Sequence, residues 1–130
     1  MIETSRLLLR ELTLDDADTL ALVLSDPVSM RYYPAPFSAE KVRQWILWNV
    51  ENYRVHGFGL WAVILKETGE LLGDCGITLQ DIEGKLLPEI GYHIRKVYCG
   101  KGFATEAAAA CIDFAFGKTK YDAVYSSMKS

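Results

Sequence analysis

The sequence has little proline and cysteine, and it has no long hydrophobic run. Its 130 residues include only 4 prolines and 10 glycines, which excludes collagen-like and low-complexity chains. No stretch approaches the roughly 18 apolar residues that a membrane-spanning helix needs. The N-terminus becomes acidic where a signal peptide would need an apolar segment, so we expect a cytoplasmic chain.

Cysteine and basic residues are also too few, or too scattered, for several kinds of site. The three cysteines, Cys75, Cys99 and Cys111, are odd in number and far apart. They suit neither a disulfide framework nor a zinc site, and we expect no metal. The chain has 14 Lys and Arg against 17 Asp and Glu, a net charge of −3. Neither a nucleic acid nor a membrane is therefore an expected partner.

What is present favours one folded domain spanning residues 1–130. Half of the residues are hydrophobic and 12% are aromatic, enough for a sizeable core. The order of the patterns predicts an α/β or α+β fold, with a mixed, mostly antiparallel sheet flanked by helices. Gly91 inside a strand indicates a bulge or a close backbone approach. The expected strands are 6–12, 58–66, 71–80, 87–95 and 121–128, and the expected helices follow Thr13 and span 39–55 and 103–117.

The connection at 96–102 is the segment most typical of a binding site. Gly100 and Gly102 allow a sharp backbone turn directly before a helix whose first N–H groups are unpaired. Lys101 adds a positive charge and Thr105 a hydroxyl, so the segment predicts an anion site. A plain glycine connection is the alternative. The dinucleotide fingerprint GxGxxG fails because Thr105 stands at its third glycine.

Several short segments together match a known family. They are residues 4–10, 57–63, 69–73, 89–92 and, most strongly, 100–107 with the sequence GKGFATEA. In this order, over nearly the whole chain, they resemble the GNAT superfamily of N-acetyltransferases. Within it, the chain resembles the branch that includes the ribosomal-protein N-terminal alanine and serine acetyltransferases.

The resemblance implies that acetyl-CoA is a co-substrate. In the family, the glycine loop and the helix start hold the pyrophosphate through backbone N–H groups, and a splayed strand edge pairs with the pantetheine. A backbone N–H near the expected bulge would polarise the acetyl carbonyl. The loop between the first two helices lines the acceptor cleft. Carried over, the cofactor residues are His93, Ile94, Arg95, Gly100, Lys101, Gly102, Phe103, Ala104 and Thr105, and the acceptor candidates are Tyr32, Tyr33 and Phe37.

The reaction that the resemblance implies is direct acetyl transfer to a primary amine. The amine would belong to a protein N-terminus, a small molecule or an aminoglycoside-like drug. Glu89 is the candidate general base, acting through water or a raised pKa, and the alternative is a solvent-facing or substrate-positioning residue. His93 could relay protons, although a structural role is favoured. Packing roles are favoured for Trp45 and Trp48, and a structural role for Glu106.

The sequence departs from the family pattern in two places. Val97 stands where the family often has Gln or Arg before its glycine loop. The chain stops at Ser130, where family members continue with another helix and strands. We therefore expect a truncated domain, or a homo-oligomer formed through the exposed last strand. A non-catalytic CoA-binding or interaction module is the alternative function, and a nucleotide-binding domain is a weaker one.

Overall fold

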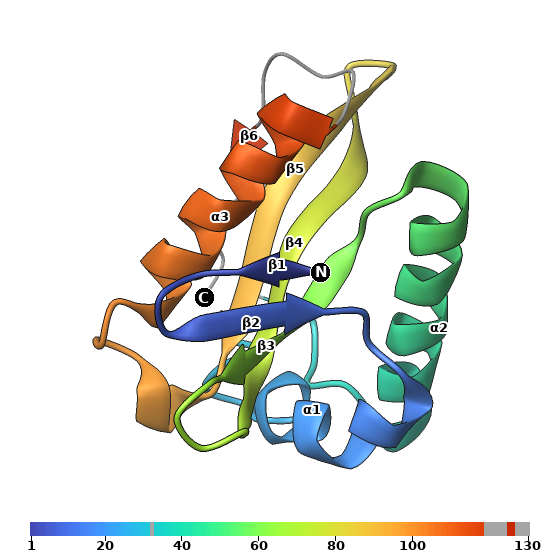
Figure 1. Cartoon of the computed structure of the whole chain (residues 1–130). Helices are drawn as coiled ribbons and strands as arrows, with labels where there is room; N and C mark the ends of the chain where they lie inside the picture. The colour runs from blue at the N-terminus through green and yellow to red at the C-terminus, as the bar shows by residue number, and fades with distance from the viewer. Residues whose placement is uncertain (32, 119–124, 127–130) are drawn as a thin grey trace.

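The computed structural model describes residues 1–31, 33–118 and 125–126. Within them the strands form one sheet in the order β1-β2-β3-β4-β5-β6 (Figure 1). All neighbouring strands are antiparallel except β5 and β6, which are parallel. The mixed, mostly antiparallel sheet is therefore confirmed. The strands are β1(Ile2–Glu3), β2(Leu7–Arg10), β3(Leu60–Leu65), β4(Leu71–Ile82), β5(Lys85–Ile94) and β6(Tyr125–Ser126), and the helices are α1(Ala17–Leu24), α2(Ala39–His56) and α3(Phe103–Lys118), with short 3-10 turns η1(Leu14–Asp16) and η2(Lys96–Tyr98).

The helix boundaries follow from capping residues in the sequence. Thr13 and Asp16 form a capping box, so the chain enters η1 and then α1 as expected. The Ser38 side chain accepts a hydrogen bond from the backbone N–H of Lys41 and caps α2. Gly57, with φ of 79°, ends that helix in the left-handed conformation.

The expected bulge at Gly91 is wrong. The pairing of β4 with β5 runs without a register shift, and Gly91 lies opposite Gly76. The irregularity instead lies between Val63 and Ile64, where β3 pairs with β4. Close backbone approaches occur instead at Gly73 and Gly76, where an added Cβ would lie 1.8 Å from the carbonyl oxygen of His93 and 2.0 Å from that of Gly59.

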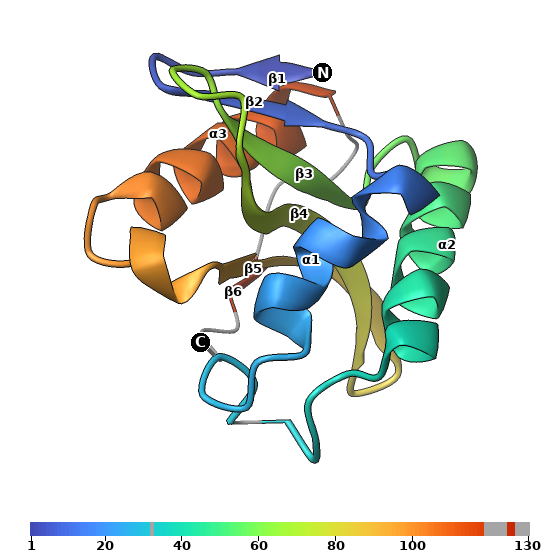
Figure 2. The same ribbon diagram turned by 90° about the horizontal axis from the view of Figure 1, so that it is seen from below.

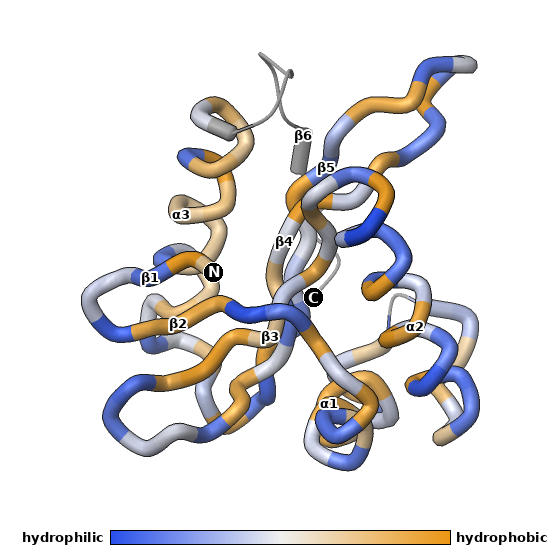
Figure 3. Tube along the Cα trace, turned by 45° about the vertical axis from the view of Figure 1, so that its right-hand side comes forward, coloured by the Kyte–Doolittle hydropathy of each residue, from blue (hydrophilic) through white to orange (hydrophobic). Residues whose placement is uncertain are grey.

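Two hydrophobic clusters lie on opposite faces of the sheet. Figure 2 shows α3 on one side and α1 and α2 on the other. One cluster joins α3 to the sheet through Ile90 and Ile94, and the other joins α1 and α2 to Ala62 and Leu71. In Figure 3 the hydrophobic segments run through β2 and β3, whereas the turn between β3 and β4 is hydrophilic. Neighbouring residues of β5 therefore face different helices.

The last expected strand lies mostly outside the described residues. Of residues 121–128, the structure describes Tyr125 and Ser126, which pair in parallel with Glu89 and Ile90 of β5. In the described part of the chain, no helix combines the length and apolar character needed to cross a membrane.

Candidate active site

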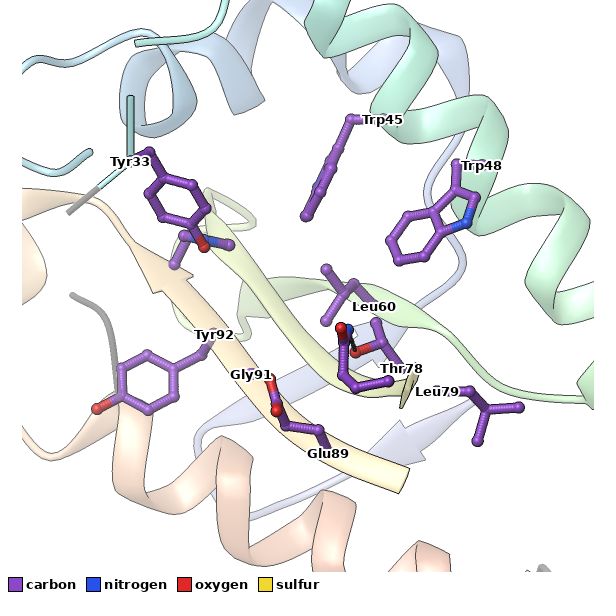
Figure 4. A pocket seen from close by; sticks show the side chains of 11 residues that line it. Tyr33, Trp45, Trp48, Leu60, Thr78, Leu79, Glu89, Gly91 and Tyr92 are labelled. Atoms are coloured by element: carbon purple, nitrogen blue, oxygen red, sulfur yellow. Dashed lines mark hydrogen bonds between the residues drawn. The ribbon is translucent and has the colours of Figure 1, made fainter. Parts of the chain in front are cut away.

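A first hollow, here called the α2 pocket, lies between α2 and the middle of β5. Its volume is about 350 Å³. Figure 4 shows Trp45 and Trp48 projecting from α2 towards the sheet, with Glu89 and Gly91 on the strand opposite. The pocket is lined by Tyr33, Trp45, Trp48, Leu60, Thr78, Leu79, Gln80, Glu89, Gly91, Tyr92 and His93.

A second hollow, the α3 pocket, lies between β5 and the start of α3. Its volume is about 300 Å³. Tyr92 belongs to both linings, so the two hollows meet at this residue. The α3 pocket is lined by Tyr92, Ile94, Tyr98, Cys99, Gly100, Gly102, Phe103, Ala104 and Thr105.

The glycine loop has the backbone conformation that an anion cradle requires. Gly100 and Gly102 have φ values of 82° and 81°, in the left-handed region that L-residues seldom adopt. A Cβ added to Gly100 would meet no atom within 4 Å, so the space beside this glycine is open to a ligand. The first N–H groups of α3 have no partner within the helix and carry its positive end. The loop therefore fits a phosphate group.

A cluster at the N-terminus of the chain holds this loop in place. Arg6 donates from Nε to Glu106 Oε1 at 2.7 Å and from Nη1 to the carbonyl oxygen of Lys101 at 3.2 Å. Its guanidinium also lies 4.3 Å from the ring centroid of Phe103. The Thr4 hydroxyl donates to Glu106 Oε2. Arg6 therefore fixes the loop and the first turn of α3 relative to β2, and Glu106 has the structural role that the sequence favoured.

The part of the chain that the structure describes leaves the backbone edge of β5 open next to the α3 pocket. Among the described residues, β6 pairs with β5 only at Glu89 and Ile90. Beyond Ile90, the edge of β5 opposite β4 has no strand partner within the described part of the chain. An open edge of this kind offers N–H and C=O groups to an extended amide chain.

Four side chains form a hydrogen-bonded chain behind the α2 pocket. Asp74 of β4 is fully buried, with 0% of its surface exposed. Its Oδ1 lies 2.8 Å from His93 Nδ1, and its Oδ2 accepts from Trp45 Nε1 at 3.0 Å. On the other side of the imidazole, His93 Nε2 lies 2.8 Å from the Tyr33 hydroxyl oxygen. A buried carboxylate is thus connected through His93 to a residue of the pocket wall.

These contacts shift the pKa values of His93 and Tyr33. Burial acts to lower the pKa of His93, but the charge of Asp74 and its hydrogen bond outweigh this effect and raise the pKa above 6.5. Burial raises the pKa of Tyr33, and the negative charges of Asp74 and Glu89 raise it further. The Tyr33 phenol therefore remains protonated at neutral pH.

Comparison with known proteins gives this arrangement a family. Residues 6–130 match the model of the acetyltransferase (GNAT) domain. The chain belongs to the GNAT acetyltransferase family. It is 40% identical to the uncharacterized protein YkkB of Bacillus subtilis over 107 residues. The aligned segment covers 82% of this chain and 62% of YkkB. The chain thus spans less than two thirds of that relative's length.

Solved structures agree with this GNAT fold. A GNAT-family acetyltransferase from Bacillus anthracis aligns with a TM-score of 0.80 and 28% identity, over 96% of this chain and 71% of that one. The ribosomal-protein acetyltransferase RimL, solved in complex with coenzyme A, aligns with a TM-score of 0.68 over 86% of this chain and 64% of that one. At 18% identity, RimL shares the fold alone with this chain.

The GNAT loop residues expected to bind the cofactor are largely brought together. Arg95 and Lys101 do not line the α3 pocket. Arg95 follows β5, and its backbone N–H donates to the carbonyl oxygen of Leu72. Its Nη1 lies 3.7 Å from Glu70 Oε2. The His93 side chain lies on the opposite face of β5, in the α2 pocket. The six expected residues that do line the α3 pocket are Ile94, Gly100, Gly102, Phe103, Ala104 and Thr105.

The acceptor candidates separate in the same way. Tyr33 lines the α2 pocket, and so does Glu89. Phe37 does not: it is buried, with its ring in edge contact with Tyr33 and Trp45. It supports the pocket wall from behind, and its contact with an acceptor stays a prediction. Tyr32 lies outside the described residues.

Four residues of the site were not among the sequence candidates. Trp45 and Trp48 were expected to pack, yet both line the α2 pocket. Tyr92 was not a candidate, but the residue belongs to the linings of both pockets. Asp74 was missed, although an acidic residue within the apolar stretch 71–79 is a detectable signal, because a buried carboxylate needs a partner.

Proposed function

We propose that this GNAT domain transfers the acetyl group of acetyl-CoA to a primary amine. The observation that carries the proposal is the meeting of the α3 pocket and the α2 pocket at Tyr92. A thioester bound along one side of β5 and an amine bound on the other side would approach each other there. Such positioning is a major source of rate enhancement in group transfer.

The α3 pocket supports the assignment of acetyl-CoA. The turn at Gly100 and Gly102 and the N-terminus of α3 suit the pyrophosphate. The edge of β5 beyond Ile90, which has no strand partner among the described residues, suits the pantetheine, which is an extended chain with two amides. When bound, acetyl-CoA supplies the activated acetyl group, and this chain's own residues bind it and handle the protons.

The α2 pocket supports a cationic acceptor, because its lining includes the Glu89 carboxylate and, across from it, Trp45 and Trp48. A primary amine is protonated at neutral pH and must lose a proton before it attacks. We assign Glu89 to accept one of the protons that leave the nitrogen, through a water molecule. A peptide N-terminus and a small amine both meet this description.

Calorimetric titration with acetyl-CoA tests the cofactor assignment first. We expect saturable binding near one site per chain. Gly102→Asp should abolish this binding, because it places a side chain and a negative charge in the anion cradle. Unchanged affinity in that variant would refute the assignment of the loop.

A thiol-release assay with a panel of amines and peptides tests the transfer itself. Glu89→Gln should keep the affinity for acetyl-CoA and lower turnover by about 100-fold, the usual contribution of one acid–base group. Full turnover in this variant would remove Glu89 from the mechanism. Binding of acetyl-CoA without thiol release from any amine would favour the non-catalytic CoA-binding module.

A further inference from the structure

We propose that Tyr33, His93 and Asp74 form a proton relay that takes a proton from the acceptor amine in the α2 pocket. The proposal rests on the amine acetylation proposed above, and it assigns chemistry to a buried cluster which that function alone does not require. Tyr33 is the catalytic residue, since it lies in the pocket wall. His93 and Asp74 act through it.

The strand pairing explains why the cluster forms. Asp74 and His93 are directly opposite in the antiparallel register of β4 and β5, so their side chains share the face covered by α2. At 0% and 5% exposure, neither side chain has access to bulk water. A carboxylate in such a place is costly unless its oxygens are bonded, and both oxygens are held, one by His93 and the other by Trp45.

The hydrogen bonds also fix which nitrogen of His93 carries a proton. An ionised Asp74 only accepts hydrogen bonds, so Nδ1 of His93, 2.8 Å away, must carry a hydrogen. In the neutral imidazole, the lone pair is then on Nε2. That nitrogen lies 2.8 Å from the Tyr33 hydroxyl, which therefore donates to it. A carboxylate thus orients an imidazole, and the imidazole accepts from a hydroxyl in the pocket.

Proton transfer from the amine to His93 requires two short steps. A proton of the bound ammonium passes to the Tyr33 oxygen as the phenolic proton passes to His93 Nε2, so that Tyr33 stays neutral and His93 becomes an imidazolium beside Asp74. The amine nitrogen then forms a bond to the acetyl carbon, the carbon–sulfur bond breaks with its electron pair on sulfur, and the second nitrogen proton passes to Glu89 and on to the thiolate. His93 finally returns its proton to the Tyr33 oxygen as Tyr33 releases its phenolic proton to water in the α2 pocket.

Two proton acceptors are required by this balance, because an ammonium loses two protons on becoming an amide. His93 is the better match for the first. The pKa of His93 is raised by Asp74, which brings it closer to that of an ammonium than an ordinary carboxyl is. The groups around the His93 ring are Asp74 from β4, Tyr33 from the loop before α2, and Glu89 on the same face of β5. Arg31 and Lys96 line the hollow on its other side.

Nuclear magnetic resonance of the imidazole nitrogens tests the relay without any turnover. The chain has only two histidines, so His56→Gln, a change at the exposed end of α2, assigns the signals of His93. Above the pH at which His93 loses its proton, we expect a neutral ring with hydrogen on Nδ1, and a shift of the Nε2 signal in Tyr33→Phe. Hydrogen on Nε2, or an Nε2 signal indifferent to Tyr33→Phe, overturns the relay whether or not the chain acetylates amines.

The kinetic test uses an amine that the wild type acetylates. Tyr33→Phe and His93→Gln should each lower kcat by about 100-fold at unchanged affinity for acetyl-CoA, and His56→Gln should change nothing. The wild-type kcat should rise with pH through an ionisation above pH 6.5, and this step should disappear in His93→Gln while remaining in His56→Gln. A pH step that persists in His93→Gln overturns the relay but leaves the proposed function standing. Absence of transfer by the wild type overturns both.

Discussion

Replacing Gly100 with alanine tests the anion cradle by backbone strain alone. Gly100 has φ of 82°, and the space beside it is empty, so the added methyl group meets nothing within 4 Å. Holding an L-residue in the left-handed region costs about 1–2 kcal/mol. The variant must either keep the loop and lose this much stability, or relax the loop and restore it on binding.

If the loop relaxes in the free variant, the loss of binding free energy cannot exceed the strain that the loop takes up again in the complex. If the loop of Gly100→Ala relaxes, acetyl-CoA should bind about 5- to 30-fold more weakly, because 1–2 kcal/mol of strain returns in the complex. If the loop does not relax, the midpoint of thermal unfolding should fall by about 4 °C for each kcal/mol. The loss of stability and the loss of binding free energy should together equal the strain of about 1–2 kcal/mol at residue 100.

Gly84 provides the matched control. It has φ of 83° in the turn between β4 and β5, and an added Cβ there also meets no atom within 4 Å. Gly84 lines neither the α2 pocket nor the α3 pocket. Gly84→Ala should therefore lower stability by a similar amount and leave acetyl-CoA binding unchanged. Thermal unfolding and calorimetric titration of both variants give the comparison. Wild-type affinity for acetyl-CoA together with wild-type stability in Gly100→Ala would refute the argument that the left-handed conformation of Gly100 shapes the cofactor site.

Two further predictions concern the supports of the site and the fold. Glu106→Gln removes the charge that Arg6 contacts at 2.7 Å, so it should lower the free energy of unfolding by about 0.5–1 kcal/mol and weaken acetyl-CoA binding a few-fold, as measured by urea unfolding and calorimetry. A stable variant with wild-type affinity would show that the contact does not support the loop. Burial acts to raise the pKa of Asp16, but hydrogen bonds from Arg10 and Thr13 outweigh it and leave the pKa below 3.8. The carboxylate therefore stabilises the fold above its unfolded pKa, and this contribution is lost as the pH falls through the lower folded pKa. Urea unfolding at pH 6 and pH 2 should show Asp16→Asn destabilised only at pH 6, and a loss of equal size at both values would contradict the assignment.

The parts of the fold that the sequence predicts well are those with local signals. The capping box at Thr13, the Ser38 cap and the Gly57 stop each act within a few residues, and the helices end where these signals indicate. The glycine loop was also predicted, because positive φ at Gly100 and an adjoining helix start are local properties. The bulge expected at Gly91 was wrong. Bulges and close backbone approaches depend on how neighbouring strands pair, and local sequence does not specify this pairing.

The α2 pocket could not be predicted in the same way, since its parts come from distant segments. Tyr33 and His93 are 60 residues apart, and Trp45 and Asp74 are 29 apart. Only the pairing of β4 with β5, together with the placement of α2, brings them into contact.

The buried acidic residue of β4 nevertheless constrains the arrangement. Asp74 must find donors from whatever elements cover it, and a misplaced α2 or a one-residue slip of β5 would leave its charge unpaired. The same hydrogen bonds of Asp74 therefore have two effects. They favour the correct strand register, and they orient the His93 imidazole towards the pocket. Variants of Asp74 should for this reason be compared with Tyr33→Phe, which removes only a hydroxyl oxygen and leaves the buried charge paired.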